Sequence, residues 1–269
     1  TKIDCEQDKS NIPKPKALAK KKKKKKGTYD DTSYSEQLVE FSYDDTSPAG
    51  VSNCDYPLDE SMREYYYLEN DIVGDCTVTA DITLKGNVNP LLSGYTINGK
   101  LIANATSTTN GFNLILSNIN ITDEINANGS GSGKRGGSIT LTDSNVANVN
   151  TNGGAISVTS SVTSQLASNS NSGGILGGNI TVDVSTTTAI YANGGDITVS
   201  TSSVGLLDST SPTDGVAGGD ITITNPISTI PSITTNGGDI TLNNVTVTGD
   251  ITANGNTGGV SAGAIIIEF

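Results

Sequence analysis

Three aspartates recur at one position of a repeated motif, and they are the residues best placed for chemistry. Asp196, Asp220 and Asp239 each follow a glycine pair and precede Ile-Thr. If the copies stack, the carboxylates lie about 5 Å apart, where like charges repel unless one is protonated or a cation bridges them. Paired acids about 5 to 9.5 Å apart can hydrolyse glycosidic bonds. This column of acids is therefore the candidate catalytic site.

Other observations favour an architectural role for the same position. Earlier copies of the motif carry Ser138, Ala155 and Asn179 there, a pattern that suits a polar corner. The chain contains no histidine, so the usual Ser-His-Asp and Cys-His arrangements are excluded. It also contains no Gly-x-x-x-x-Gly-Lys-(Ser/Thr) run for binding phosphate. We predict a non-enzymatic protein with no catalytic residues, cofactor or metal site, and we keep polysaccharide degradation as the alternative.

The aspartates belong to a Gly-Gly-x-Ile-Thr-(Leu/Val/Ile) motif that recurs from about residue 70 onward. Its second glycine falls at Gly137, Gly154, Gly178, Gly195, Gly219 and Gly238, with a terminal echo at Gly259. Two degenerate copies begin upstream, at Tyr95 and Phe112. Gaps of 17, 24, 17, 24, 19 and 21 residues separate the glycine markers, so short units alternate with long ones. Such a period is typical of repeat architectures.

Each copy also has the pattern of a strand with one buried face. Ile197 and Val199, for example, alternate with Thr198 and Ser200. No copy is long enough to form a sheet alone, so neighbouring copies must stack at about 4.8 Å to complete the buried face. We predict an all-β fold, a parallel β-helix (β-solenoid) of about nine coils preceded by an irregular N-terminal arm.

Further positions are expected to point inward or to form corners. The inward set on the second and third faces is Val146, Val162, Val204, Ile119, Ile121, Ile125, Val245, Val247 and Ile251. The glycine pairs are expected at sharp corners that require positive φ. Asparagine, which tolerates the same backbone region, precedes the pair at Asn110, Asn152, Asn193 and Asn236. We interpret these asparagines as corner residues.

The motif resembles the repeats of filamentous-haemagglutinin-like exoproteins, which are secreted adhesins. The matching residues are Gly177–Val182, together with loops that run into the glycine pair, such as Ser211–Gly219. The likeness covers about residues 70 to 269, and phage tailspikes and viral fibres share the pattern. It implies a right-handed helix, in agreement with the crossover rule for parallel strands. It also implies an extracellular, cell-surface or virion location, with surface glycans as candidate ligands.

Charge divides the chain into a basic arm and an acidic remainder. The net charge is −12, but residues 1–26 carry +8 and the rest carries −20. The lysines of the run Lys20–Lys26 repel one another, so an extended arm is expected. Either this arm binds an anionic partner, such as nucleic acid or an acidic protein surface, or it is a flexible arm surrounded by solvent. Opposite charges in one chain also favour contacts between copies, and salt would screen them beyond about 8 to 10 Å.

Residues 27–70 form an acidic, tyrosine-bearing segment for docking or capping, and residues 71–269 form the repeat domain. Leu38, Val39 and Phe41 are expected in a strand, and the run Tyr65–Leu68 is expected to cover the first coil. The three cysteines, Cys5, Cys54 and Cys76, have no metal-ligand spacing. One disulfide among them, such as Cys54 with Cys76, is plausible in an oxidising compartment.

Two outer surfaces complete the predictions. The apolar terminal stretch Ala264–Phe269 indicates either a chain that continues or an edge that pairs with another chain. Outward threonines at Thr140, Thr181, Thr198, Thr222 and Thr241 could order water or ice, although Thr is also simply a common strand residue. The chain has no apolar run of about 18 residues, so neither a membrane span nor a signal peptide is expected.

Together these features predict a structural or adhesive β-helix subunit of an extracellular fibre or virus particle. Its charged N-terminal arm and the ends of the helix would mediate assembly into homo-oligomers, filaments or particles. The long loops would offer a recognition surface. The alternative is a tailspike-like enzyme that degrades polysaccharides at Asp196, Asp220 and Asp239.

Overall fold

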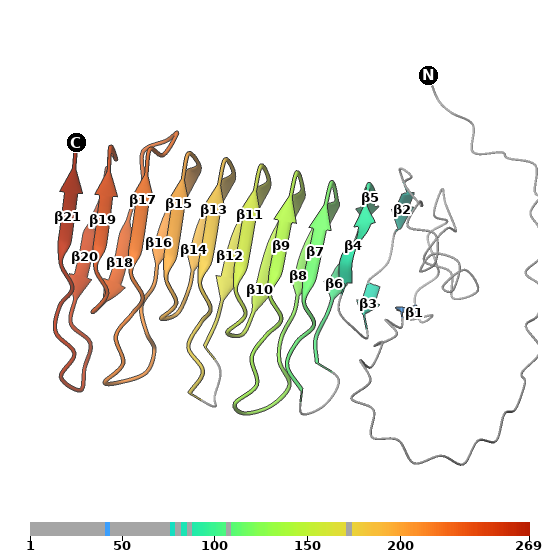
Figure 1. The fold of residues 1–269 in the computed structure, drawn as a ribbon, viewed down its shortest axis with the longest axis horizontal. Coiled ribbons are helices and arrows are strands. Elements are labelled where there is room, and N and C mark those ends of the chain that lie inside the picture. The colour runs from blue at the N-terminus through green and yellow to red at the C-terminus, as the bar shows by residue number, and fades with distance from the viewer. Residues whose placement is uncertain (1–40, 44–75, 79–81, 85–87, 106–108, 171–173) are drawn as a thin grey trace, which may run out of the picture. The chain divides into compact units, whose positions relative to one another are not determined.

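The computed structural model describes residues 41–43, 76–78, 82–84, 88–105, 109–170 and 174–269. These residues form strands, turns and loops, with no helix among them, and therefore no helix that could span a membrane. The strands lie in two sheets whose members are stacked parallel to one another (Figure 1). The predicted parallel β-helix is confirmed.

The first sheet, here the motif sheet, contains the repeated motif. Its nine strands are β4 (Val88–Ser93), β7 (Leu114–Ser117), β9 (Ile139–Thr142), β11 (Ile156–Thr159), β13 (Ile180–Asp183), β15 (Ile197–Ser200), β17 (Ile221–Thr224), β19 (Ile240–Asn243) and β21 (Ile265–Glu268). Each strand pairs in parallel with the strands of the coils on either side, in the order of the chain. Nine strands agree with the nine coils expected from the repeat.

The second sheet, here the return sheet, carries the chain back across each coil. Its twelve strands are β1 (Phe41–Tyr43), β2 (Cys76–Val78), β3 (Ile82–Leu84), β5 (Tyr95–Ile97), β6 (Leu101–Ile102), β8 (Asn120–Asn126), β10 (Asn145–Thr151), β12 (Val162–Ser168), β14 (Thr186–Tyr191), β16 (Ser203–Asp208), β18 (Ile233–Asn236) and β20 (Ile251–Asn254). All pairings are parallel except that of β1, which lies antiparallel to β3. β1 therefore pairs with the edge that β3 would otherwise leave open.

The long strands of the return sheet have two halves. β5 pairs with the first half of β8 and β6 pairs with its second half, so one long strand continues two short ones. The register shifts between Val146 and Asn148 of β10, as expected for a β-bulge, which bends a strand. The second and third inward faces predicted from the sequence are thus the two halves of one sheet.

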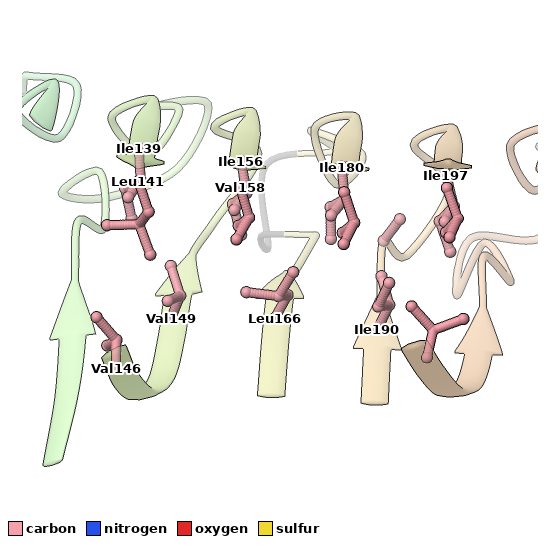
Figure 2. Close-up of a cluster of buried hydrophobic side chains, with 14 of the residues drawn as sticks. Ile139, Leu141, Val146, Val149, Ile156, Val158, Leu166, Ile180, Ile190 and Ile197 are labelled. Atoms are coloured by element: carbon pink, nitrogen blue, oxygen red, sulfur yellow. The ribbon is translucent and has the colours of Figure 1, made fainter. Parts of the chain in front are cut away.

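Columns of aliphatic side chains fill the space between the sheets (Figure 2). On the motif sheet, the first and third strand residues are buried in each strand from β7 to β19, as in Ile156 with Val158 and Ile180 with Val182. The return sheet contributes Val149, Leu166 and Ile190 from the opposite side, and the labelled side chains of the two sheets face each other. Small branched residues thus form a long, thin core that contains no aromatic ring among its buried members.

Several inward predictions are confirmed and one is wrong. Ile119, Ile121, Ile125, Val146 and Val204 are buried, and Val245, Val247 and Ile251 pack partly buried against the core. Val162 is 52% exposed, and Thr163 takes the inward place beside Val146. The error is a slip of one residue, which moves a strand side chain to the opposite face.

Two repeat markers were also misplaced. Tyr95 lies on β5 of the return sheet, and the motif strand of that coil is β4. At the other end, β21 pairs in register with β19, so the glycine equivalent to Gly238 is Gly263 rather than Gly259. The sequence around Tyr95 resembles the motif only because both sheets use alternating strands.

Candidate functional site

The predicted column of acids is real, and its carboxylates bind the backbone. Asp196 Oδ1 accepts a hydrogen bond from Asp220 N at 3.0 Å, and Asp220 Oδ1 accepts one from Asp239 N at 2.8 Å. Asp239 Oδ1 accepts a bond from Ala264 N at 2.7 Å. Each carboxylate therefore binds the amide of the equivalent residue in the next coil.

In earlier coils, an asparagine side chain accepts the same hydrogen bond from the backbone of the next coil. Asn179 Oδ1 accepts a bond from Asp196 N at 3.0 Å, and Asn113 Oδ1 accepts one from Ser138 N at 2.8 Å. An uncharged amide oxygen is thus sufficient at this position. The three aspartates are also exposed, whereas a carboxyl that serves as a general acid is usually kept protonated by an apolar pocket. The geometry suits a structural ladder better than a pair of catalytic acids.

The second glycine of each motif also stacks on its neighbour, for a reason that the sequence did not indicate. A Cβ built on Gly195 would lie 2.5 Å from the carbonyl oxygen of Gly178, and Gly178, Gly219 and Gly238 meet the glycine of the preceding coil as closely. Positive φ was predicted for both glycines of the pair. In the six strong copies the second glycine never has it, and the first has it only at Gly153, Gly194 and Gly237, with φ of 88°, 98° and 113°. The second is needed because the backbones approach each other too closely for a side chain.

The opposite corner of the coil carries a ladder of buried serines that the sequence analysis missed. Ser161 Oγ accepts a bond from Ser144 N, Ser185 Oγ from Ser161 N, and Ser202 Oγ from Ser185 N, each at 3.0 Å. Each of these hydroxyls also donates to the carbonyl two residues earlier, as Ser185 does to Asp183 at 2.7 Å. A signal was available, because Ser144, Ser161, Ser185 and Ser202 all lie five residues after the first motif isoleucine of their coil.

The asparagines before the glycine pairs hold the long loops. The side-chain amide of Asn236 accepts a bond from Ser211 N and donates to Ser211 O, at 2.6 and 2.8 Å. Asn152 makes the same two bonds to Gly129. Of the four predicted corner asparagines, only Asn193 has positive φ, at 40°. The others were correctly placed at corners, but they act as side-chain braces for the loop of the neighbouring coil.

The outward threonines form the predicted column on the motif sheet. Thr181, Thr198 and Thr222 pair in register and are exposed, while Thr140 and Thr241 are partly exposed. Ser157 completes the column between Thr140 and Thr181. The column of aspartates lies two residues away along the same strands, so charge borders the hydroxyls. Ordering of water or ice by this face stays a prediction.

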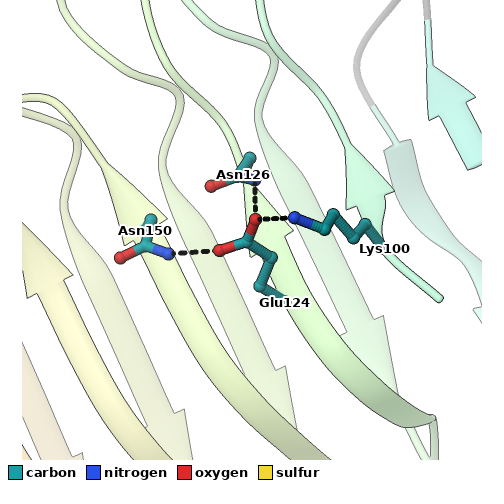
Figure 3. Close-up of polar contacts among 4 residues, drawn as sticks. All are labelled: Lys100, Glu124, Asn126 and Asn150. Atoms are coloured by element: carbon teal, nitrogen blue, oxygen red, sulfur yellow. Dashed lines mark hydrogen bonds and ion pairs between the residues drawn. The ribbon is translucent and has the colours of Figure 1, made fainter. Parts of the chain in front are cut away.

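A polar cluster joins three coils on the outside of the return sheet (Figure 3). Lys100 Nζ lies 2.7 Å from Glu124 Oε1, which also accepts a bond from Asn126, and Asn150 donates to Oε2 at 3.0 Å. These bonds lower the pKa of the Glu124 carboxyl below its ordinary value, and the hydrogen bond from Lys100 has the largest effect. Because every bond favours the ionised carboxylate, the cluster stabilises the stack rather than preparing an acid or a base.

The last strand leaves one end of the stack uncovered. Ile265 and Ile267 continue the two inward columns of the motif sheet, yet they are 46% and 49% exposed. Their neighbours Ile240 and Leu242, one coil earlier, are buried. Ile266 and Phe269 are exposed as well. β21 therefore presents an apolar surface and one unpaired backbone edge.

Several predictions lie outside the described residues. They include the arm with Lys20–Lys26, the run Tyr65–Leu68, and Cys5 and Cys54. Cys76 begins β2, whose backbone pairs with β5, and the predicted disulfide stays a prediction. The boundaries at residues 26 and 70 also stay predictions. Within the described ranges, no group of three or more Cys, Asp or Glu side chains converges to hold a metal ion.

Comparisons with known proteins add no further assignment. The chain matches no protein-family model. Searches of curated proteins and of solved structures find no significant similarity. The functional argument therefore depends on the geometry of the stack and its surfaces.

Proposed function

We propose that this chain is a structural or adhesive β-helix subunit of an extracellular fibre or a virus particle. The hydrogen bonds that join each coil to the next carry the proposal, and strand β21 supports it. Its edge offers backbone N–H and C=O groups in register for another strand, and Ile265 and Ile267 offer apolar surface that a further layer would bury. We propose that a strand of another subunit pairs with this edge wherever no further coil of the same chain covers it.

The distribution of polar groups supports a structural role. The serine ladder, the column of aspartates and the asparagine braces all direct their bonds from one coil to the next. Such a stack is a stiff rod in which each coil contacts only its neighbours. Stiffness along one axis suits a fibre or a spike that must hold a binding surface away from its base.

Charge supplies the second contact. The arm of residues 1–26 carries +8 and the remainder −20. Exposed carboxylates of Asp196, Asp220 and Asp239 lie along the motif sheet towards the β21 end. We propose that the arm of one subunit reaches an acidic surface of the next, and that salt weakens this contact.

Negative-stain microscopy of the full chain and of a chain lacking residues 1–26, at low and high salt, tests the proposal. A matched control replaces Lys20–Lys26 with glutamine, which keeps the length but removes the charge. Assemblies that need the arm and low salt support it. Monodisperse rods in every condition contradict it.

A second pair of variants tests the strand edge itself. Ile266→Lys places a charge on the exposed strand and should prevent assembly, because inserted lysines block edge pairing. Thr241→Lys changes the same column one coil earlier, on a strand that is already paired on both sides, and should assemble normally. Equal behaviour of the two variants would contradict a role for β21.

The alternative of polysaccharide degradation has a direct test. Asp196, Asp220 and Asp239 are in line and exposed, so a glycan could reach them. Cleavage of capsular or cell-wall glycans that disappears with Asp220→Asn would favour the enzyme. Absence of cleavage by the intact chain would leave the structural proposal.

A further inference from the structure

A hollow lies at the corner where the first coils turn from the motif sheet into the return sheet. Two columns of residues line it. The turn residues Asn118, Asp143 and Ser160 form one column, and Thr96, Asn120 and Asn145 form the other. The hollow is far along the coil from the long loops, which join the return sheet to the glycine pairs.

Strand pairing sets the spacing of these side chains. Asn120 lies between Thr96 and Asn145 on adjacent parallel strands, so the three follow one another at about 4.8 Å. The turn residues follow the motif strands β7, β9 and β11 and have φ of 51°, 49° and 50°. Gly94 occupies the turn before them, and its lack of a side chain leaves the first coil open.

Most of the polar side chains that line the hollow form no hydrogen bond within the described structure. The side chains of Thr96, Asn118, Asn120, Asp143 and Asn145 make no hydrogen bond or ion pair within the described part of the chain. Ser144, deeper in the same hollow, belongs to the serine ladder and is fully bonded. The side-chain amides of Asn118, Asn120 and Asn145 are therefore available to bind a ligand in the hollow.

The charges of the lining residues limit the classes of ligand that the hollow could bind. Asp143 is its only ionisable residue, and it contains no basic side chain, so a phosphate or sulfate group has no partner. One carboxylate is a poor ligand set for calcium, which takes six to eight oxygens. Amides and hydroxyls both donate and accept, which matches the hydroxyl groups of a sugar. We propose that this corner binds a neutral oligosaccharide.

The column of polar residues Thr96, Asn120 and Asn145 ends at the next coil, where the equivalent residue is apolar. Val162 pairs with Asn145 and occupies the same column, where it is 52% exposed. Thr186 follows it in the column. The polar array therefore spans the coils of β5, β8 and β10 along this column, and the proposed ligand lies along the stack axis over that length. Because the lining has no aromatic ring for stacking, we expect a dissociation constant of about 1 mM.

Nuclear magnetic resonance of the full chain tests the proposal. The probes are neutral glucose, mannose and galactose oligosaccharides, with a hyaluronate oligosaccharide and calcium chloride as separate arms. We expect a neutral oligosaccharide to shift the side-chain amide signals of Asn118, Asn120 and Asn145. The double variant Asn120→Val with Asn145→Val copies the Val162 coil, so it should fold and bind at least about tenfold more weakly. Thr186→Val, in the same column outside the hollow, should bind normally.

Other outcomes overturn the proposal. Shifts caused only by hyaluronate or calcium would mean that the site takes an ion, and absence of shifts with every neutral probe would mean that no such site exists. Normal binding by the Asn120 and Asn145 double variant would place the ligand elsewhere. Binding by single, unassembled rods would count in favour of the site, so its test is separate from that of fibre assembly.

Discussion

Thr163 and Thr187 lie opposite each other on β12 and β14, and both hydroxyls are buried without a hydrogen-bond partner in the described residues. Val146 and Val204 hold the flanking positions of the same column. Thr163→Val and Thr187→Val should each raise stability by about 1 kcal/mol, because valine fits the strand and removes an unpaired buried group. Chemical denaturation measures the change.

Thr151→Val is the matched control for these variants. Thr151 is equally buried, but its hydroxyl donates to Gly137 O at 3.1 Å. The same substitution should therefore lower stability by about 1 kcal/mol. Destabilisation by valine at all three positions would show that Thr163 and Thr187 have partners in solution, such as buried water.

Gly195→Ala should be among the most destabilising single changes. Its Cβ would lie 2.5 Å from the carbonyl oxygen of Gly178 and 2.6 Å from that of Gly177, and backbone atoms cannot turn aside as a flexible side chain can. We expect a loss of more than about 2 kcal/mol, visible as a lower melting temperature. Gly131→Ala is the control: φ is 84° there and no atom lies within 4 Å, so only the strain of about 1 kcal/mol applies. Equal losses would mean that contact between the glycines is not the cause.

Ser185→Ala should interrupt the serine ladder at its middle. The variant removes the acceptor for Ser161 N and leaves that buried amide unpaired. A loss of about 1 to 3 kcal/mol is expected. Ser157→Ala, on the outer face of the same stack, should change stability little. Hydrogen exchange of the Ser161 amide gives a local readout, and unchanged protection there would contradict the ladder.

Glu124 should make stability depend on pH. Its folded pKa is lowered, chiefly by the bond from Lys100, so its contribution is complete above the unfolded pKa of about 4.5 and is lost as pH falls through the lower folded value. Glu124→Gln should flatten this acid limb in denaturation curves measured from pH 6 downward. Asp123→Asn, an adjacent exposed acid, is the control and should leave the limb intact. Identical limbs in wild type and Glu124→Gln would contradict the assignment.

Asp220 should be replaceable by asparagine but not by alanine. Asn179 shows that an amide oxygen can accept the bond from the next coil, so Asp220→Asn keeps the ladder and reduces repulsion between neighbouring carboxylates. Asp220→Ala loses the bond to Asp239 N and should cost about 1 kcal/mol. Thermal melting distinguishes the two. An asparagine variant as unstable as the alanine variant would show that the charge itself is required.

The motif sheet could be predicted from the sequence because its pattern is strict. Isoleucine at the first and an aliphatic residue at the third strand position recur in coil after coil, as in Ile197 with Val199. The stacked aspartates followed from the same register. The coils differ in length, but the extra residues of the long coils lie in loops, so the columns keep their register.

The return sheet was harder to predict because its inward positions include polar residues. Thr163 is polar but its place in the strand register buries it, whereas the apolar Val162 is exposed. A prediction based on hydrophobicity therefore assigned Val162, rather than Thr163, to the core. Buried serines such as Ser185 resemble loop residues until a partner coil is present to bond them. Backbone approach at Gly195 is equally invisible, since it depends on the glycine of another coil.

The ladders of aspartate, glycine and serine make each coil an interchangeable step. Equivalent serines are 17 residues apart across a short coil and 24 across a long one, and each is hydrogen-bonded to its counterpart in the adjacent coil. If one short and one long coil were duplicated or deleted together, the coils at the new junction would form the same kinds of ladder hydrogen bonds. Such a change would alter the reach of the molecule by about 10 Å. The length of this rod can therefore change in evolution through the number of its coils, while the core residues of each coil stay the same.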